Sequence, residues 1–98
     1  MKPTIALTLA LAAWPACGQD TAGRNLAAAC AICHGTQGKP PSGAPVVPLA
    51  GLPREHIATQ MRAFRDGTRP ATVMHQIAKG YNDQQIDAMA AWFAAQRR

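Results

Sequence analysis

The spacing of apolar residues predicts an amphipathic helix in the middle of the chain. Between residues 53 and 67, the side chains of Ile57, Met61 and Phe64 fall on one stripe of a helix. Pro53 suits the first helical position, where its missing N–H costs no hydrogen bond, and Gly67 is a natural stop. We therefore expect a helix here that turns one apolar stripe towards a core.

A second helical pattern lies near the C-terminal end. Asn82 followed three residues later by Gln85 is a capping-box pattern, in which each side chain bonds the other residue's backbone N–H. Beyond this start the apolar residues are spaced i, i+3, i+4 and i+7: Ile86, Met89, Ala90 and Phe93. This spacing predicts a last helix that buries one face.

Two further helical segments are expected. An Ala-rich stretch over residues 22–33 favours a helix, with Asp20 and Thr21 as its expected N-cap residues. Residues 34–53 are rich in Gly and Pro and predict a loop, while a short element over residues 73–80 precedes the last helix. Since no segment alternates apolar and polar residues as a strand does, the sequence predicts an all-α fold.

Residues 1–18 have the layout of a secretory signal peptide. One lysine precedes an apolar run over residues 5–14, which is too short to span a bilayer. Removal of this leader would leave residues 19–98 as one exported domain, which we expect in the periplasm. In the alternative interpretation Cys17 is lipidated and tethers the domain to a membrane, although Trp14 stands where such signals usually have Leu.

The exported domain is small and is expected to need a covalent staple. About 80 residues bury little apolar surface, and Cys30 and Cys33 are the only cysteines beyond the leader. Two cysteines this close together cannot build a disulfide framework. The formal net charge of the whole chain is +5, a mild excess without an aromatic-interleaved basic stripe, so we expect no nucleic-acid partner.

The stretch CAICHG, residues 30–35, carries the clearest chemistry. Two cysteines at this spacing followed directly by a histidine predict covalent attachment of one haem c. Cys30 and Cys33 would bond the haem vinyl carbons, and His34 would reach the iron. A zinc site would need two further ligands, and a thioredoxin-like redox pair would need a βαβ context. Haem c is therefore the favoured interpretation.

The residue on the iron opposite His34 decides whether the haem carries electrons or binds a ligand. The side chains that can serve are Met61, Met74, Met89, His56 and His75. Met61 and Met89 lie on apolar helical stripes, where methionine is usually core filler, and His56 stands beside an acid at a helix start. Met74 follows a turn broken by Gly and Pro, and a His/Met pair suits an electron carrier. We favour Met74, with its neighbour His75 as the rival.

Together these pieces resemble the class I c-type cytochromes of the small periplasmic kind, close to the cytochrome c4 type. The matching pieces are CAICHG, LAGLP over residues 49–53, Met74, and IAKGYNDQQI over residues 77–86. The stretch FRDGTRPATVMHQIAKGY, residues 64–81, is especially similar to the haem subunit of flavocytochrome c sulfide dehydrogenase. The resemblance implies about four helices packed around one covalently attached haem, whose iron is held by His34 and Met74.

The resemblance also implies two further haem-binding residues. The family usually has PxLAG, in which the backbone carbonyl at the proline accepts a hydrogen bond from the iron-bound histidine. Here the order is VVPLAG, so Val47 stands where that proline would be, and its carbonyl can serve the same purpose. Tyr81 is expected beside the haem, with a place in the core as the alternative.

The function that the resemblance implies is transfer of single electrons by a protein that is not an enzyme on its own. In flavocytochrome c the haem subunit accepts electrons from a flavoprotein that oxidises sulfide, so a flavoprotein subunit is the expected partner. A free carrier serving other periplasmic redox proteins is the alternative, and a haem enzyme or gas sensor with an open sixth site is a further one.

Three arginines share an adjacent face of the helix expected over residues 53–67: Arg54, Arg62 and Arg65. They form either a docking surface or, as we favour, a solvated face.

Overall fold

A computed structural model describes residues 2–6, 8, 10 and 18–98. Most of the expected signal peptide, including Cys17, lies outside the described residues. Among the described residues, no helix has the length and apolar character needed to cross a bilayer.

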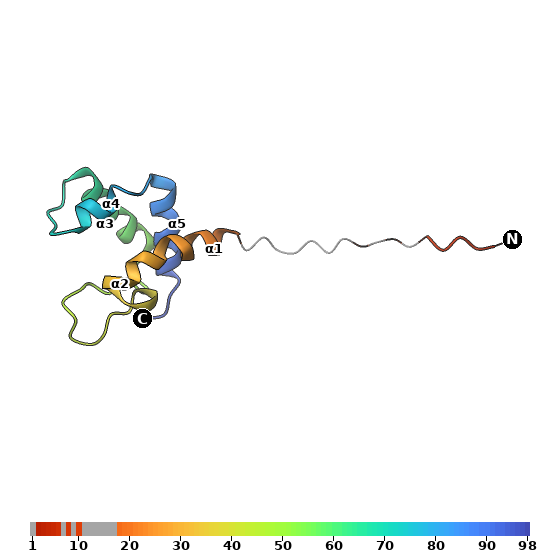
Figure 1. Cartoon of the computed structure of the whole chain (residues 1–98), viewed down its shortest axis with the longest axis horizontal. Helices are drawn as coiled ribbons and strands as arrows, with labels where there is room; N and C mark the ends of the chain where they lie inside the picture. The colour runs from red at the N-terminus through yellow and green to blue at the C-terminus, as the bar shows by residue number, and fades with distance from the viewer. Residues whose placement is uncertain (1, 7, 9, 11–17) are drawn as a thin grey trace.

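The described part of the chain is helical and contains no strand, as the sequence predicts (Figure 1). The elements in chain order are α1 (Gly18–Ala27), the 3₁₀ turn η1 (Ala28–Cys30), α2 (Ala31–His34), the 3₁₀ turn η2 (Thr36–Gly38), α3 (Arg54–Asp66), α4 (Met74–Ala78) and α5 (Asp83–Ala94). Because α1, η1 and α2 follow one another without a break, the described residues form four helical bodies besides the short turn η2.

The start of the first helix differs from the expectation. The helix begins at Gly18, so Asp20 and Thr21 lie inside α1 and are not its N-cap residues. The capping preference of Asp and Thr is worth only about 1 kcal/mol, and the Ala-rich sequence allows the helix to extend past them. The helical run then tightens to 3₁₀ at η1 and delivers Cys33 and His34 at its C-terminal end, as expected.

Two of the expected helix boundaries, at Gly67 and Asn82, are present, whereas Pro53 does not occupy the first helical position at which it was expected. Gly67 ends α3 in the left-handed conformation, with φ of 80°, which a glycine adopts without steric cost. At α5, Asn82 accepts a hydrogen bond from the Gln85 backbone at 2.8 Å and the Gln85 side chain returns one to the Asn82 N–H at 2.9 Å. Pro53 precedes α3 by one residue and is its N-cap, because its ψ of 136° is extended.

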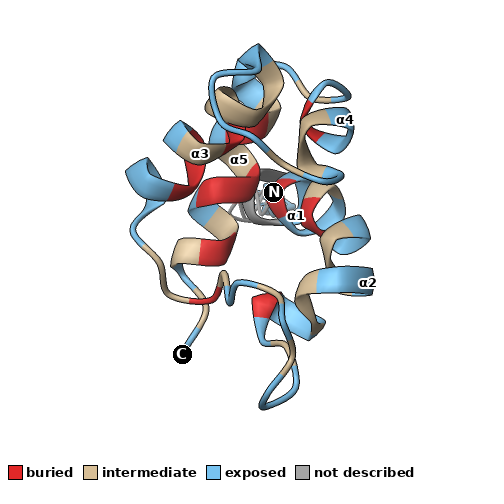
Figure 2. Cartoon of the chain, turned by 90° about the vertical axis from the view of Figure 1, so that its left-hand side faces the viewer, coloured by how far each residue is buried: buried red, intermediate tan, exposed pale blue. Residues whose placement is uncertain are grey.

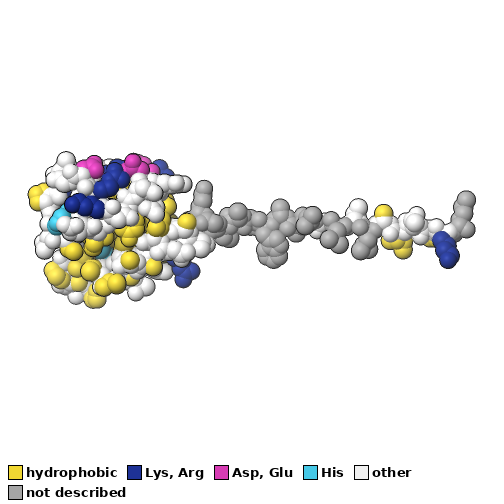
Figure 3. Space-filling model, turned by 45° about the horizontal axis from the view of Figure 1, so that its top comes forward, with side chains coloured by type: hydrophobic (Ala, Val, Ile, Leu, Met, Phe, Trp, Pro, Cys, Tyr) yellow, Lys and Arg dark blue, Asp and Glu magenta, His cyan; other side chains and the backbone are white. Residues whose placement is uncertain are grey.

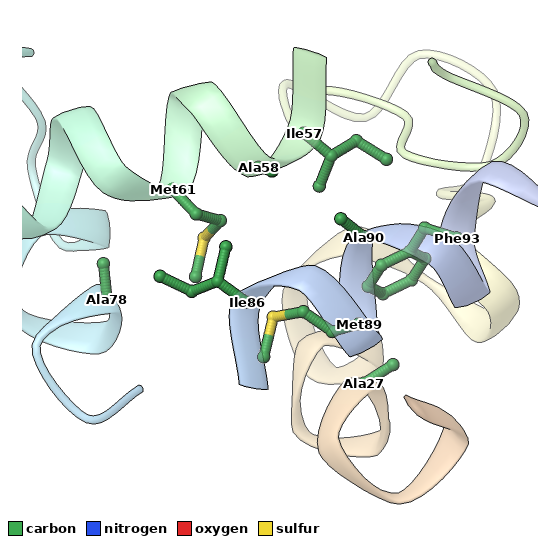
Figure 4. Close-up of a cluster of buried hydrophobic side chains, with 9 residues drawn as sticks. All are labelled: Ala27, Ile57, Ala58, Met61, Ala78, Ile86, Met89, Ala90 and Phe93. Atoms are coloured by element: carbon green, nitrogen blue, oxygen red, sulfur yellow. The ribbon is translucent and has the colours of Figure 1, made fainter. Parts of the chain in front are cut away.

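The core is formed where α1, α3, α4 and α5 meet (Figures 2 and 4). Its buried members are Ala27, Ile57, Ala58, Met61, Ala78, Ile86, Met89, Ala90 and Phe93. The four apolar residues that the last-helix spacing singled out are among them. At the crossing of α1 and α5, a Cβ atom added to Gly23 would lie only 2.8 Å from the Ala88 carbonyl oxygen. Gly23 therefore permits the close approach of these helices.

Three ion pairs join α3 to the first two turns of α5. The Arg62 guanidinium contacts Asp83 at 3.1 Å and Asp87 at 2.7 Å, and Arg65 contacts Asp83 at 2.9 Å. The hydrogen bonds from both arginines hold the pKa of the Asp83 carboxyl below its usual value. Arg62 and Arg65 are thus engaged within the molecule, and the sequence pattern, which treated them as a solvated or docking face, did not reveal these partners.

Candidate haem site

One large apolar cavity opens between the cysteine motif, the following loop, α3 and α4. Its volume is about 710 Å³, within the range of roughly 300–1,000 Å³ typical of small-molecule and cofactor sites. All six residues expected at the haem line it: Cys30, Cys33, His34, Val47, Met74 and Tyr81. The structure therefore brings together, in one place, residues spread over half the chain.

His34 is fixed by the loop that follows it. Its Nδ1 atom lies 2.7 Å from the Val47 carbonyl oxygen, which is the contact that the resemblance implied. A carbonyl can only accept a hydrogen bond, so Nδ1 carries the proton and donates, and Nε2 is left as the atom free to bind iron. The same bond holds the imidazole ring in one orientation.

The loop is itself held by the backbone at Gly38. The Gly38 carbonyl accepts hydrogen bonds from the N–H groups of Leu49 at 2.9 Å and Ala50 at 3.2 Å. Gly38 has φ of 75°, and an added Cβ atom would lie 2.9 Å from the Ala50 nitrogen and 3.0 Å from the Phe93 ring. A glycine is therefore required at position 38. Its two hydrogen bonds to the loop fix the position at which the Val47 carbonyl meets His34.

The two cysteines differ in their surroundings. Cys30 is half-buried and Cys33 is exposed, and burial raises the pKa of the Cys30 thiol. Tyr81 also lines the cavity, and the pKa of its hydroxyl is raised by burial and by the nearby Cys30. The tyrosine is therefore neutral at physiological pH and adds no charge to the cavity.

Met74 is the first residue of α4, which packs against α3. Its rival His75 is not among the cavity-lining residues, and the His75 Nδ1 atom is buried without a hydrogen-bond partner. Met61 and Met89 reach the cavity, but both are core residues, 7% and 1% exposed, among the side chains drawn in Figure 4. His56 lines the cavity from α3 and is exposed.

Apolar side chains form much of the cavity wall. Ile57, Phe64, Ile77 and Met89 all line the cavity. In the space-filling view, hydrophobic side chains gather over one part of the domain, whereas charged side chains of both signs lie together along another edge (Figure 3).

Two polar residues that line the cavity, Gln60 and Arg69, were not singled out from the sequence. Arg69 places its guanidinium 4.7 Å from the centroid of the Phe64 ring and donates a hydrogen bond to Gln60 Oε1. A faint signal exists for Gln60, because positions 56, 60 and 64 repeat every four residues and so share one face of α3. Arg69 left no signal, because only the reversal at Gly67 brings it back over that face.

The residues present fit a haem c. Two thiols at the attachment spacing, an imidazole with Nε2 free and a wide apolar wall meet in one cavity. Among the described residues, no group of three or more His, Cys, Asp or Glu side chains is placed so that it could hold a metal ion.

The chain is similar to known proteins over most of its length. The family model for cytochrome c matches residues 21–96. The chain is 38% identical over 89 residues to a thiosulfate dehydrogenase electron acceptor of Thiomonas intermedia, covering 89% of this chain and 40% of the relative. It is 39% identical over 75 residues to the cytochrome subunit of sulfide dehydrogenase of Chlorobaculum tepidum, covering 76% of this chain and 66% of the relative.

A third relative is cytochrome c4 of Pseudomonas aeruginosa, 37% identical over 83 residues, with 84% of this chain and 40% of the relative covered. The chain thus spans about two fifths of the length of two of these relatives and about two thirds of the third. Proteins of the matched family bind haem c covalently, and the attachment cysteines here are Cys30 and Cys33. The motif, the all-α fold and the family match lead to one conclusion: this chain belongs to the cytochrome c family.

Proposed function

We propose that this chain carries single electrons on one haem c whose iron is held by His34 and Met74. The observation that carries the proposal is the convergence of the CAICHG motif and Met74 on a single apolar cavity, from which His75 is absent. The relatives with cytochrome and electron-acceptor names support it. They also support the view that the chain is not an enzyme on its own.

The bound haem supplies a one-electron iron couple, and the chain's residues tune it. The hydrogen bond from His34 to the Val47 carbonyl fixes the ring and makes it a better donor. A thioether such as that of Met74 favours the reduced iron and raises the reduction potential. Ile57, Phe64 and Ile77 exclude water from the cavity. With both ligands held in place, little has to move when the oxidation state changes.

The first experiment is the absorption spectrum of the oxidised holoprotein. Met74→Leu should abolish the weak far-red sulfur-to-iron band. Met61→Leu is the matched control, because it removes another cavity-lining thioether at similar volume and should leave the band intact. A band that survives Met74→Leu would overturn the assignment of Met74. If His75→Ala loses the band and Met74→Leu keeps it, the assignment of Met74 would also be overturned.

We also propose that the domain is exported to the periplasm and serves as the haem subunit of a sulfide-oxidising flavoprotein complex. Support comes from the leader-like residues 1–18, the similarity of residues 64–81 and the 39% identity to a sulfide dehydrogenase cytochrome subunit. The alternative is a free electron acceptor, which is favoured by the identity to a thiosulfate dehydrogenase electron acceptor.

The size and flavin content of the native assembly separate these two roles. A subunit should be purified from its host with flavin in a fixed ratio to haem and should be reduced by sulfide within that complex. A free carrier should be isolated as a flavin-free species, and sulfide should not reduce it rapidly. Carbon monoxide binding to the ferrous protein tests the remaining alternative, an enzyme or gas sensor, because an iron held by His34 and Met74 should not bind it readily.

A further inference from the structure

The haem cavity is lined by few polar side chains. Apart from the attachment motif, the polar side chains that line it are His56, Gln60, Arg69 and Tyr81. Haem c carries two propionate groups, and an ionised carboxylate left in apolar surroundings without a partner is strongly disfavoured. The propionates must therefore reach either solvent or these polar residues.

Arg69 is the one Lys or Arg side chain among the residues lining the cavity. The neighbouring arginines are already matched, because Arg54, Arg62 and Arg65 each have a carboxylate of this chain within 3.3 Å. Within the described part of the chain, the contacts of Arg69 are with an aromatic ring and an amide, and it forms no ion pair there. Its positive charge is thus available to a bound anion.

The fold holds Arg69 on the cavity side of α3. Gly67 reverses the chain, and the N–H groups of Thr68 and Arg69 both bond the Ala63 carbonyl, at 3.0 and 3.2 Å. This turn lays the guanidinium over Phe64 and against Gln60, which both line the cavity. A guanidinium has five N–H donors in a planar fork, so one bond to Gln60 leaves donors for a carboxylate.

We propose that Arg69 anchors a haem propionate, with Phe64 as the surface on which its guanidinium stacks and Gln60 as the side chain that orients it. Arg69 acts as a positioning residue for the haem and as a fixed positive charge beside it. A positive charge there favours the reduced iron, since the oxidised centre carries one more positive charge. The inference rests on haem in this cavity and not on the identity of the second iron ligand.

The test compares the reduction potentials of Arg69→Gln and Arg54→Gln holoproteins. Both variants remove one arginine charge, but Arg54 is exposed, is paired with Glu55 and does not line the cavity. We expect the potential to fall clearly in Arg69→Gln and to change little in Arg54→Gln, with Arg69→Lys recovering part of the loss. Equal shifts in the two Gln variants would overturn the proposal.

A second measurement uses the unaltered protein and so does not depend on folding of a variant. The haem propionate protons are followed by NMR against pH, while the ring protons of His56 and Tyr81 report the other titratable groups on the cavity. An arginine partner should lower the pKa of one propionate by about one to three units relative to a free carboxyl. Two propionates that both titrate in the ordinary range would overturn the proposal. Neither measurement depends on the far-red band that tests Met74, so the two ideas can fail separately.

Discussion

The cavity has two sides that are built in different ways. The His34 side consists of α2, η2 and the loop to Leu52, and the Met74 side consists of α3, the turn after it and α4. On the His34 side, the residues are placed by the attachment motif and by backbone groups, including the carbonyls of Gly38 and Val47. On the Met74 side, they are placed by side-chain packing and by charge, as in Arg69 on Phe64 and Arg62 with Asp83.

This difference implies that the two sides of the cavity depend on the sequence in different ways. Backbone hydrogen bonds depend little on which side chain stands at a position, so the His34 side should tolerate substitutions that preserve its backbone, apart from those at Cys30, Cys33 and His34. The Met74 side depends on particular side chains that meet across the fold. We therefore expect the two sides to respond differently to substitution.

The largest effect should come from removing the anchor of the His34 side. In Cys30→Ala/Cys33→Ala the haem cannot be bonded, and we expect loss of most of the helical circular dichroism, because so small a domain buries too little apolar surface by itself. Cys17→Ala is the matched control and should retain attached haem. A double variant with full helicity and cooperative unfolding would show that the core suffices without the cofactor.

The next largest effect should come from the glycine that clamps the loop. Gly38→Ala introduces a side chain at positive φ and against the Ala50 nitrogen and the Phe93 ring, whereas Gly43→Ala has the same kind of φ, 83°, with no atom within 4 Å. Both variants place an alanine at positive φ and so carry the same conformational cost. The difference between their free energies of unfolding therefore reports the steric clash at position 38. We expect the free energy of unfolding of Gly38→Ala to be lower by roughly 2 kcal/mol than that of Gly43→Ala. Equal values in denaturant titrations would mean that the loop shifts freely.

A smaller, pH-dependent effect is expected where α3 meets α5. The pKa of Asp83 is lowered in the folded state by Arg62 and Arg65, so its contribution to stability is present above the unfolded-state pKa. That contribution is lost as pH falls through the lower folded-state pKa. Asp83→Asn should therefore lower the thermal midpoint slightly at pH 7, and the difference from wild type should disappear in strong acid.

The matched control for the Asp83 variant is Glu55→Gln. Within the described part of the chain, the one ion pair of Glu55 is with its neighbour Arg54, at 3.2 Å, and its side chain is 81% exposed. Added salt should shrink the effect of Asp83→Asn, because the pairs are exposed to solvent. If Asp83→Asn lowers the thermal midpoint by the same amount at low pH as at pH 7, the aspartate acts through packing and not through charge.

The smallest effect should come from Val47→Ala. The bond to His34 uses the backbone carbonyl, and the side chain is 57% exposed. We expect a reduction potential close to that of the wild type and a change in unfolding free energy of about 0.5 kcal/mol or less. If Val47→Ala shifts the reduction potential as much as Arg69→Gln does, the valine side chain itself contributes to the reduction potential.

Much of the fold could be predicted because its signals are local. The capping box at Asn82 and the stop at Gly67 involve residues within a few positions of one another, and the structure contains both. The start of the first helix was predicted wrongly, because Asp20 and Thr21 are compatible with a cap and also with a helical first turn. Local preference could not choose between these two conformations.

The site was predictable only in part for a related reason. Cys30, Cys33 and His34 are adjacent in sequence, so their chemistry can be recognised without a fold. The exclusion of His75 from the cavity could not be recognised, because it depends on how α4 lies on α3. Likewise the partners of Arg62 are 21 and 25 residues away, and no spacing rule within a helix reaches that far.

The sequence by itself determined the cofactor, its attachment and the positions of most helices, because each depends on groups that the covalent chain already holds close together. Only the tertiary structure decided which face of α4 meets the cavity, which acids neutralise Arg62 and Arg65, and that Arg69 folds back over Phe64 beside the haem site. These contacts join residues whose distance is set by packing of the whole core, so they appear only once the helices are in place.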